Sequence, residues 1–282
     1  MKTWLFVPGH EPDKIRKALA SRADVVIVDW EDAVPVSQKE QARSMTRATL
    51  VDLPSRPRVV LRINSAKTDQ YAQDIASLQG LPVSAIMLAK ASEPAELPHL
   101  AEQGKAIIPV IESALGIENA FQIAKAHPLV ERLVLGTMDL MANMGAQWEP
   151  DGPALQYRRS RLLIANRAAG LAGPIDGVYP QLSDLDGLHR EATTARKLGF
   201  AGKLILHPRQ IDVVHQVFLP TREEIEQARE TIAAFDEAIA AGRSAIRMGD
   251  RFVDPPIVIW AQNVLRMGGE EIEALTSLQN GH

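Results

Sequence analysis

The chain has 282 residues, of which 46% are hydrophobic and 23% charged, and its formal net charge is −4. These values are typical of a globular protein with one large or two smaller domains, and the slight acidity gives no reason to expect a nucleic-acid partner. The absence of cysteine excludes disulfides, thiolate nucleophiles and cysteine-ligated metal centres. Because no apolar run approaches the ~20 residues of a membrane span and no signal peptide is recognisable, we expect a cytoplasmic protein without a membrane partner.

Short apolar runs alternate with longer helical segments through most of the chain. The predicted strands are Trp4–Val7, Val25–Val28, Val59–Ile63, Ala85–Leu88, Ile107–Ile111, Leu133–Leu135, Ile175–Val178 and Leu204–Leu206. The predicted helices between them include Pro12–Ser21, Ser37–Val51, Asp69–Leu78, Ile117–Ala126, Leu155–Ala169 and Asp184–Leu198. This alternation predicts an α/β protein, and the strand count and chain length favour a (β/α)8 TIM barrel over an open sheet. No glycine-rich nucleotide loop follows the first strand, which argues against a dinucleotide site.

The pattern changes near residue 220. Thr221 and Glu224 have the spacing of a capping box, which predicts the start of a long helix. A polar connection, Arg247–Asp254, separates this helix from a second one that starts at a Pro-Pro pair. We therefore expect a barrel over residues 1–220 and a C-terminal helical extension over residues 221–282, acting as a lid or in oligomerisation.

Charged side chains follow the predicted strands at the positions where barrels carry function. The residues at these strand ends are Pro8–Gly9, Glu31–Asp32, Arg62–Asn64, Lys90, Glu112, Asp139, Asp176–Tyr179 and His207. The many carboxylates suit a hard divalent cation, and the cations among them suit an anionic substrate. The scarcity of histidine argues against zinc, and no Gly-x-Ser-x-Gly motif is present.

Two segments of the sequence share the same pattern of an apolar strand followed by an acidic residue. AIIPVIES (Ala106–Ser113) and RLVLGTMDL (Arg132–Leu140) each place an acid, Glu112 or Asp139, after an apolar strand. For either acid alone, a cap of the following helix is the favoured interpretation. As a pair at neighbouring strand ends, they predict a metal or substrate site.

The other charged candidates also have structural alternatives. Glu31 and Asp32 are consistent with a cap or with a favourable contact to a helix dipole. Arg62 is suited either to a carboxylate ligand or to a structural ion pair, and we favour the ligand. Lys90 is a possible Schiff-base lysine, but an ion pair with a neighbouring acid is the better interpretation.

Further candidates lie near the ends of the first and last strands of the barrel. Lys14 and Lys17 are three residues apart and lie on one helical face, so they are either surface lysines or contacts for a phosphate near the barrel mouth. His207, which precedes a proline, is explained equally well by a hydrogen bond to a loop backbone.

Nine motifs in order connect the chain to a known family. They are LFVPG (Leu5–Gly9), VDWEDAV (Val28–Val34), LRIN (Leu61–Asn64), IPVIES (Ile108–Ser113), GTMDL (Gly136–Leu140), RSRLLIANRAAGL (Arg159–Leu171), IDGVYP (Ile175–Pro180), GFAGKLILHPRQ (Gly199–Gln210) and VDPP (Val253–Pro256). Through these motifs nearly the whole chain resembles the citrate lyase β-subunit-like and malyl-CoA lyase family, within the HpcH/HpaI aldolase/citrate lyase group.

The resemblance implies a (β/α)8 barrel that binds Mg²⁺, or Mn²⁺, through Glu112 and Asp139. Arg62 matches the arginine that binds the substrate carboxylate. Glu31 and Asp32 match acids that order the water shell of the metal. These roles agree with the cluster of charges at the strand ends.

The resemblance also implies sites for coenzyme A and for proton transfer. Lys14 and Lys17, together with Leu206 and His207, fall where members of the family bind the CoA moiety. Asp254 matches a catalytic aspartate that in relatives reaches over the barrel of a neighbouring subunit, which implies a homo-oligomer, with a trimer favoured. An Asp before Pro-Pro is also an N-cap signal, so Asp254 is suited to both roles.

The family pattern differs here at two positions, where Met138 replaces a glutamate and Trp30 a smaller residue. We expect these replacements to make the pocket more apolar. The implied reaction is cleavage or formation of a 3-hydroxyacyl thioester, giving a 2-oxo acid and an acetyl- or propionyl-thioester. The alternatives are a metal-dependent aldolase acting on free 2-oxo acids, a thioesterase, and a non-catalytic ligand-binding subunit.

Overall fold

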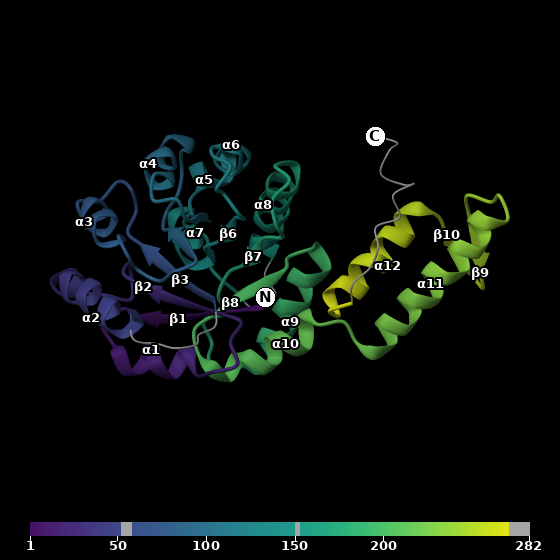
Figure 1. Ribbon diagram of the computed structural model, residues 1–282, viewed down its shortest axis with the longest axis horizontal. Coiled ribbons are helices and arrows are strands. Elements are labelled where there is room, and N and C mark those ends of the chain that lie inside the picture. The colour runs from purple at the N-terminus through teal and green to yellow at the C-terminus, as the bar shows by residue number, and fades with distance from the viewer. Residues whose placement is uncertain (52–57, 150–152, 271–282) are drawn as a thin grey trace. The chain divides into compact units, whose positions relative to one another are not determined.

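The computed structural model describes residues 1–51, 58–149 and 153–270. The chain forms two compact units, Met1–Phe218 and Leu219–His282. The first unit is built around strands and the second mainly around two helices (Figure 1).

The strands of the first unit form one closed parallel barrel in sequence order (Figure 1). They are β1 (Thr3–Pro8), β2 (Val25–Asp29), β3 (Arg58–Ile63), β4 (Ala85–Leu88), β5 (Ala106–Ile111), β6 (Val134–Leu135), β7 (Ile175–Asp176) and β8 (Gly202–Ile205). Pairing of Thr3 in β1 with Lys203 in β8 closes the ring. The predicted (β/α)8 barrel is confirmed.

Helices surround the barrel and connect successive strands (Figure 1). They are α1 (Pro12–Leu19), α2 (Lys39–Val51), α3 (Gln70–Ser77), α4 (Pro98–Ala101), α5 (Ala114–Glu118), α6 (Ala120–Lys125), α7 (Thr137–Asn143), α8 (Gln156–Ala168), α9 (Leu185–Leu198) and α10 (Ile211–Phe218). Short 3-10 turns precede four of them: η1 (Val36–Gln38), η2 (Pro94–Glu96), η3 (Pro153–Leu155) and η4 (Pro208–Gln210). The helix predicted over Ile117–Ala126 is instead a pair, α5 and α6, because Asn119 between them leaves the helical conformation (ψ 3°).

Most strand residues are apolar because both faces of the strands are buried. In β2, Val25 and Ile27 belong to the cluster that fills the barrel, whereas Val26 and Val28 belong to the cluster between strands and helices. Trp4 lies in the inner cluster, with the Arg58 and Arg132 guanidinium groups 5.7 and 5.3 Å from its ring centre. Since Arg58 begins β3, these two arginines lie at the opposite end of the barrel from the strand ends expected to carry function.

The second unit contains α11 (Arg222–Ala240), β9 (Ile246–Met248), β10 (Arg251–Val253) and α12 (Pro255–Met267). The capping box predicted at its start is present, since Glu224 N donates to Thr221 Oγ1 (3.1 Å) and Thr221 N donates to Glu224 Oε2 (2.7 Å). The segment expected to be only a polar connection is instead an antiparallel hairpin, turning at Gly249 with φ +60°. Among the described residues, no helix is long and apolar enough to cross a membrane.

Candidate functional site

Glu112 directly follows β5 and is only 3% exposed. Its Oε1 accepts a hydrogen bond from Lys90 N (2.7 Å). The adjacent Ser113, and not Glu112, caps α5 by accepting from Gly116 N (3.0 Å), so the capping interpretation of Glu112 is wrong. Gly136 lets Glu112 approach closely, because a Cβ at that position would lie 2.2 Å from Glu112 Oε2.

Asp139 lies in the first turn of α7, four residues after β6 ends at Leu135. The predicted order of an apolar strand, a glycine and then Asp139 is present, and Asp139 is carried by the helix that follows. Its side chain is 41% exposed, and its Oδ1 lies 3.9 Å from Lys90 Nζ. Helix α7 thus brings Asp139 to the cavity that Glu112 borders.

One cavity of about 510 Å³ contains both acids. It is lined by Ser65, Lys67, Thr68, Lys90, Ser92, Glu112, Ser113, Leu115, Asp139 and Asn143. Except for Leu115, these lining residues carry polar or charged side chains. Neither Trp30 nor Met138 belongs to this lining. Trp30 is fully buried and points away, with its Nε1 donating to Thr46 Oγ1 in α2 (2.9 Å).

Lys90, which follows β4, pairs with the two acids that follow β2. Its Nζ donates to Glu31 Oε1 and to Asp32 Oδ1 (3.1 Å). Burial lowers the pKa of Lys90, but these hydrogen bonds outweigh burial and raise it above the usual range. The lysine is therefore a charged ammonium, which supports the predicted ion pair over a Schiff-base amine. Its backbone has φ 55°, a conformation that is costly for a residue with a Cβ and that is concentrated at functional sites.

Arg62 is held by a residue that the sequence analysis did not single out. Arg62 Nε donates to Asp29 Oδ1 (2.7 Å) and Nη2 donates to Asp29 Oδ2 (2.6 Å), while Nη1 lies 3.2 Å from Glu31 Oε2. The two residues are cross-strand neighbours, because Asp29 ends β2 in register with Arg62 of β3. The predicted strand ended at Val28, one residue before Asp29, so the sequence signal was the acid directly after that strand. Asp29 and Glu31 hold Arg62 in its charged form, with its pKa above the usual range despite burial.

A second missed residue supports the turn that carries Glu31. Lys39 of α2 is buried, and its Nζ donates to the carbonyl oxygens of Trp30 and Glu31 (both 2.9 Å) and to Asn64 Oδ1 (2.7 Å). Burial lowers the pKa of Lys39. The ammonium thereby fixes the backbone on either side of the Trp30–Glu31 peptide.

The site carries more acids than cations. Burial raises the pKa of Glu112 to about 8; Arg62 opposes this shift, while Asp139 and Glu31 add to it. The carboxylates are Asp29, Glu31, Asp32, Glu112 and Asp139, and the cations in direct ion pairs with members of this group are Arg62 and Lys90. This excess of oxygen donors and negative charge fits a hard divalent cation.

This site offers a divalent cation few protein ligands. Within residues 1–51, 58–149 and 153–270, no three acidic or histidine side chains are grouped as a complete metal cage. A cation held by Glu112 and Asp139 therefore needs water and substrate oxygens to complete its coordination. Mg²⁺ prefers such an incomplete protein site.

The residues expected to bind coenzyme A follow two paired strands, β1 and β8. Lys14 and Lys17 are exposed on α1, and Lys14 Nζ donates to Glu11 Oε1 (2.7 Å). Leu206 is exposed after β8. His207 Nδ1 accepts from Arg209 N (3.1 Å), so the predicted hydrogen bond to a loop backbone is present.

Asp254 belongs to the second unit. It is the N-cap of α12, and its Oδ1 accepts a hydrogen bond from Ile257 N (3.4 Å). The N-cap role predicted from the Pro-Pro sequence is therefore present.

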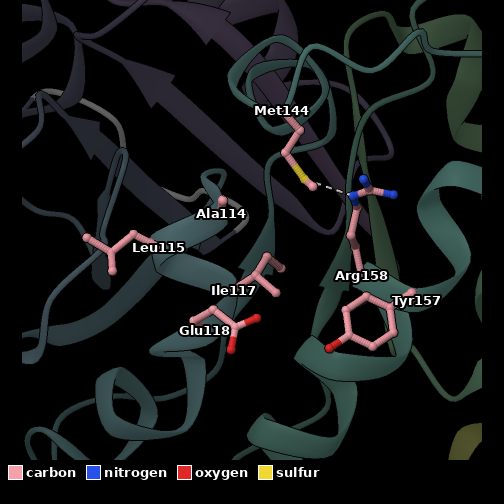
Figure 2. Close-up of a pocket in the computed structure, with 7 residues that line it drawn as sticks. All are labelled: Ala114, Leu115, Ile117, Glu118, Met144, Tyr157 and Arg158. Atoms are coloured by element: carbon pink, nitrogen blue, oxygen red, sulfur yellow. Dashed lines mark hydrogen bonds between the residues drawn. The ribbon is translucent and has the colours of Figure 1, made fainter.

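A neighbouring cavity of about 400 Å³ shares Leu115 with the first (Figure 2). Figure 2 shows Arg158 of α8 reaching toward Met144, with Arg158 Nε 3.1 Å from Met144 Sδ. The other residues that line this second cavity are Ala114, Ile117, Glu118 and Tyr157. Since Glu112 and Asp139 line the first cavity, the first is the candidate site.

Comparison with known proteins agrees with the fold. The citrate lyase subunit beta of Leuconostoc mesenteroides subsp. cremoris is 36% identical, over 94% of this chain and 92% of its own. A (3S)-malyl-CoA thioesterase of Cereibacter sphaeroides is also 36% identical, over 93% of this chain and 92% of its own. The structure of the Mycobacterium tuberculosis CitE protein with magnesium, acetoacetate and coenzyme A superposes with a TM-score of 0.84 at 35% identity, over 95% of this chain and 98% of that one. Since residues 2–208 also match the family as a whole, this chain belongs to the HpcH/HpaI aldolase/citrate lyase family.

Proposed function

We propose that this protein is a Mg²⁺-dependent carbon–carbon lyase acting on a 3-hydroxyacyl-CoA, with a 2-oxo acid and an acetyl- or propionyl-CoA as products. The observation that carries the proposal is the single cavity lined by Glu112 and Asp139, with Arg62 within electrostatic reach of Glu112. The magnesium and coenzyme A in the M. tuberculosis relative, and the citrate lyase among the relatives, support this reaction class.

The roles of the site residues follow from their charges. Glu112 and Asp139 hold the cation, which when bound supplies a Lewis acid that polarises the keto or hydroxyl oxygen of the substrate. Arg62 binds the substrate carboxylate through paired N–H groups. Glu31 and Asp32, kept in place by Lys90, accept hydrogen bonds from water around the cation.

The thioester enters from the side of β1 and β8 in this proposal. Lys14 and Lys17 are exposed cations suited to CoA phosphates, with Leu206 and His207 on the loop of the adjacent strand. Asp254 transfers the proton at the α-carbon of the thioester, acting over the barrel of a neighbouring subunit in a homo-oligomer, for which the family resemblance favours a trimer. The second unit serves as the lid that keeps water from the carbanion.

An assay that measures 2-oxo acid and free thiol separately tests the reaction. Malyl-, citramalyl- and citryl-CoA are supplied with Mg²⁺ or with a chelator. Lyase activity should release 2-oxo acid without free thiol, and only with Mg²⁺. Free thiol without 2-oxo acid would indicate a thioesterase, and turnover of CoA-free 2-oxo acids would indicate an aldolase. Metal binding without any turnover would indicate a non-catalytic subunit. Each of these results would contradict the proposal.

Arg62→Lys should lower kcat/KM by about 10–100-fold although the positive charge remains, because an ammonium cannot form the paired N–H contacts of a guanidinium. Arg58→Lys is the matched control. Arg58 begins the same strand and pairs with Glu131 at the other end of the barrel, so its replacement should affect stability and leave kcat/KM unchanged. Equal kcat/KM in the parent and Arg62→Lys would exclude the assigned role.

A further inference from the structure

We infer that Asp29 is a positioning residue, which aims the Arg62 guanidinium and the Glu31–Asp32 turn at the same ligand. The inference rests on the proposed function, since it presumes that Arg62 binds the carboxylate of a 2-oxo acid. It adds a buried residue that holds Arg62 and the backbone of Glu31 through hydrogen bonds.

The hydrogen bonds of Asp29 account for both of its oxygens. Oδ1 accepts from Arg62 Nε (2.7 Å) and from Glu31 N (2.9 Å). Oδ2 accepts from Arg62 Nη2 (2.6 Å) and from Ala33 N (3.1 Å). A carboxylate offers about four acceptor positions, and all of them are used here. Asp29 is also fully buried, so it cannot contact substrate and must act through its partners.

The same contacts leave one edge of Arg62 for a ligand. A guanidinium has five N–H groups, and Asp29 accepts hydrogen bonds from the N–H on Nε and from one N–H on Nη2. Each terminal nitrogen therefore keeps at least one N–H that Asp29 does not use, and Glu31 Oε2 faces Nη1 at 3.2 Å. The ring of Phe6 lies 4.7 Å from the guanidinium carbon and restrains its plane. The Nη1–Nη2 edge, which Glu31 contacts at Nη1, suits a carboxylate, because a carboxylate is planar and accepts two parallel hydrogen bonds.

Asp29 also couples Arg62 to the neighbouring acids. Its bonds to Glu31 N and Ala33 N hold the turn whose side chains bind Lys90. Removing the charge of Asp29 therefore loosens the carboxylate-binding arginine and the turn together. A displacement of about 1 Å at reacting groups is enough to cost on the order of 10²-fold in rate.

The test compares Asp29→Asn with Glu131→Gln. Both variants neutralise a carboxylate that forms two hydrogen bonds with an arginine of β3, but Glu131 pairs with Arg58 at the far end of the barrel. The readouts are the unfolding temperature and the Kd of pyruvate and of oxaloacetate for the Mg²⁺-loaded protein, measured by titration calorimetry. We expect both variants to lose stability, and only Asp29→Asn to bind the 2-oxo acids about 10–100-fold more weakly.

A double-variant cycle separates positioning from general destabilisation. If Asp29 acts through Arg62, Asp29→Asn should weaken binding much less in an Arg62→Lys background than in the parent. If Asp29→Asn does not fold, Asp29→Glu replaces it, because the extra methylene keeps the charge but displaces the guanidinium, and the same weakening is expected.

The outcomes separate the inference from the proposed function. Parent-like 2-oxo acid affinity in Asp29→Asn, or in its Glu substitute, would overturn the inference while leaving the proposed function intact. Full additivity in the cycle would also overturn it. A parent protein that binds neither pyruvate nor oxaloacetate with Mg²⁺ would instead remove the proposed function on which the inference rests.

Discussion

Replacing Asp254 with asparagine should reduce turnover by about 10²–10⁴-fold, the usual contribution of a general acid–base group. The asparagine side-chain oxygen can still accept the hydrogen bond from Ile257 N, so the N-cap of α12 should survive. Mg²⁺ binding should be unchanged, because the proposed metal ligands belong to the barrel. Asp250→Asn is the control, since Asp250 is an exposed acid of the same hairpin region that pairs with Arg247.

Mixing inactive variants tests whether Asp254 acts on a neighbouring subunit. Asp254→Asn chains and Glu112→Gln chains are each expected to be inactive alone. After subunit exchange, some sites should combine an intact barrel with an intact Asp254 and regain part of the parent activity. If verified mixed oligomers stay inactive, Asp254 acts within its own chain. If Asp254→Asn alone keeps parent turnover, Asp254 is only a helix cap.

Mg²⁺ affinity should rise about tenfold for each pH unit up to about pH 8 and then level off. Burial raises the pKa of Glu112 to about 8 in the metal-free protein, so below that pH the cation must displace one proton from this ligand. Calorimetry in buffers of different ionisation enthalpy should detect the released proton. Glu112→Gln should bind Mg²⁺ at least 100-fold more weakly and lose the pH dependence, and Asp139→Asn should also weaken binding. Parent-like affinity in both variants would refute the ligand assignment.

The raised pKa of Glu112 also affects the stability of the metal-free protein. A carboxyl group whose pKa is higher in the folded state than the ordinary value of 4.5 makes the free energy of unfolding fall as the pH rises from about 4.5 to about 8. Glu112→Gln should therefore raise the unfolding temperature of the metal-free protein at pH 8 and above, relative to the parent. Added Mg²⁺ should stabilise the parent and not the variant. An unchanged unfolding temperature in metal-free Glu112→Gln would contradict the raised pKa.

The sequence by itself determined the elements whose signals are local. Strands buried on both faces are mostly apolar, so the runs of the barrel were recognisable one by one. Caps are equally local, which is why Thr221 with Glu224 and Asp254 before Pro-Pro were correct predictions. The alternation of strands and helices, their number and the chain length then favoured the barrel over an open sheet.

Only the tertiary structure decided which side chains meet at the strand ends. Trp30 and Glu31 are adjacent in sequence, yet in the turn after β2 Trp30 packs toward α2 and Glu31 toward Lys90. Asp29 was recognisable as the acid directly after a predicted strand, but its bond to Arg62 depends on the register between β2 and β3. The raised pKa of Glu112 likewise depends on burial and on acids distant in sequence. Local composition places charges along the chain, whereas their partners, burial and protonation follow from how the closed barrel brings the strand ends together.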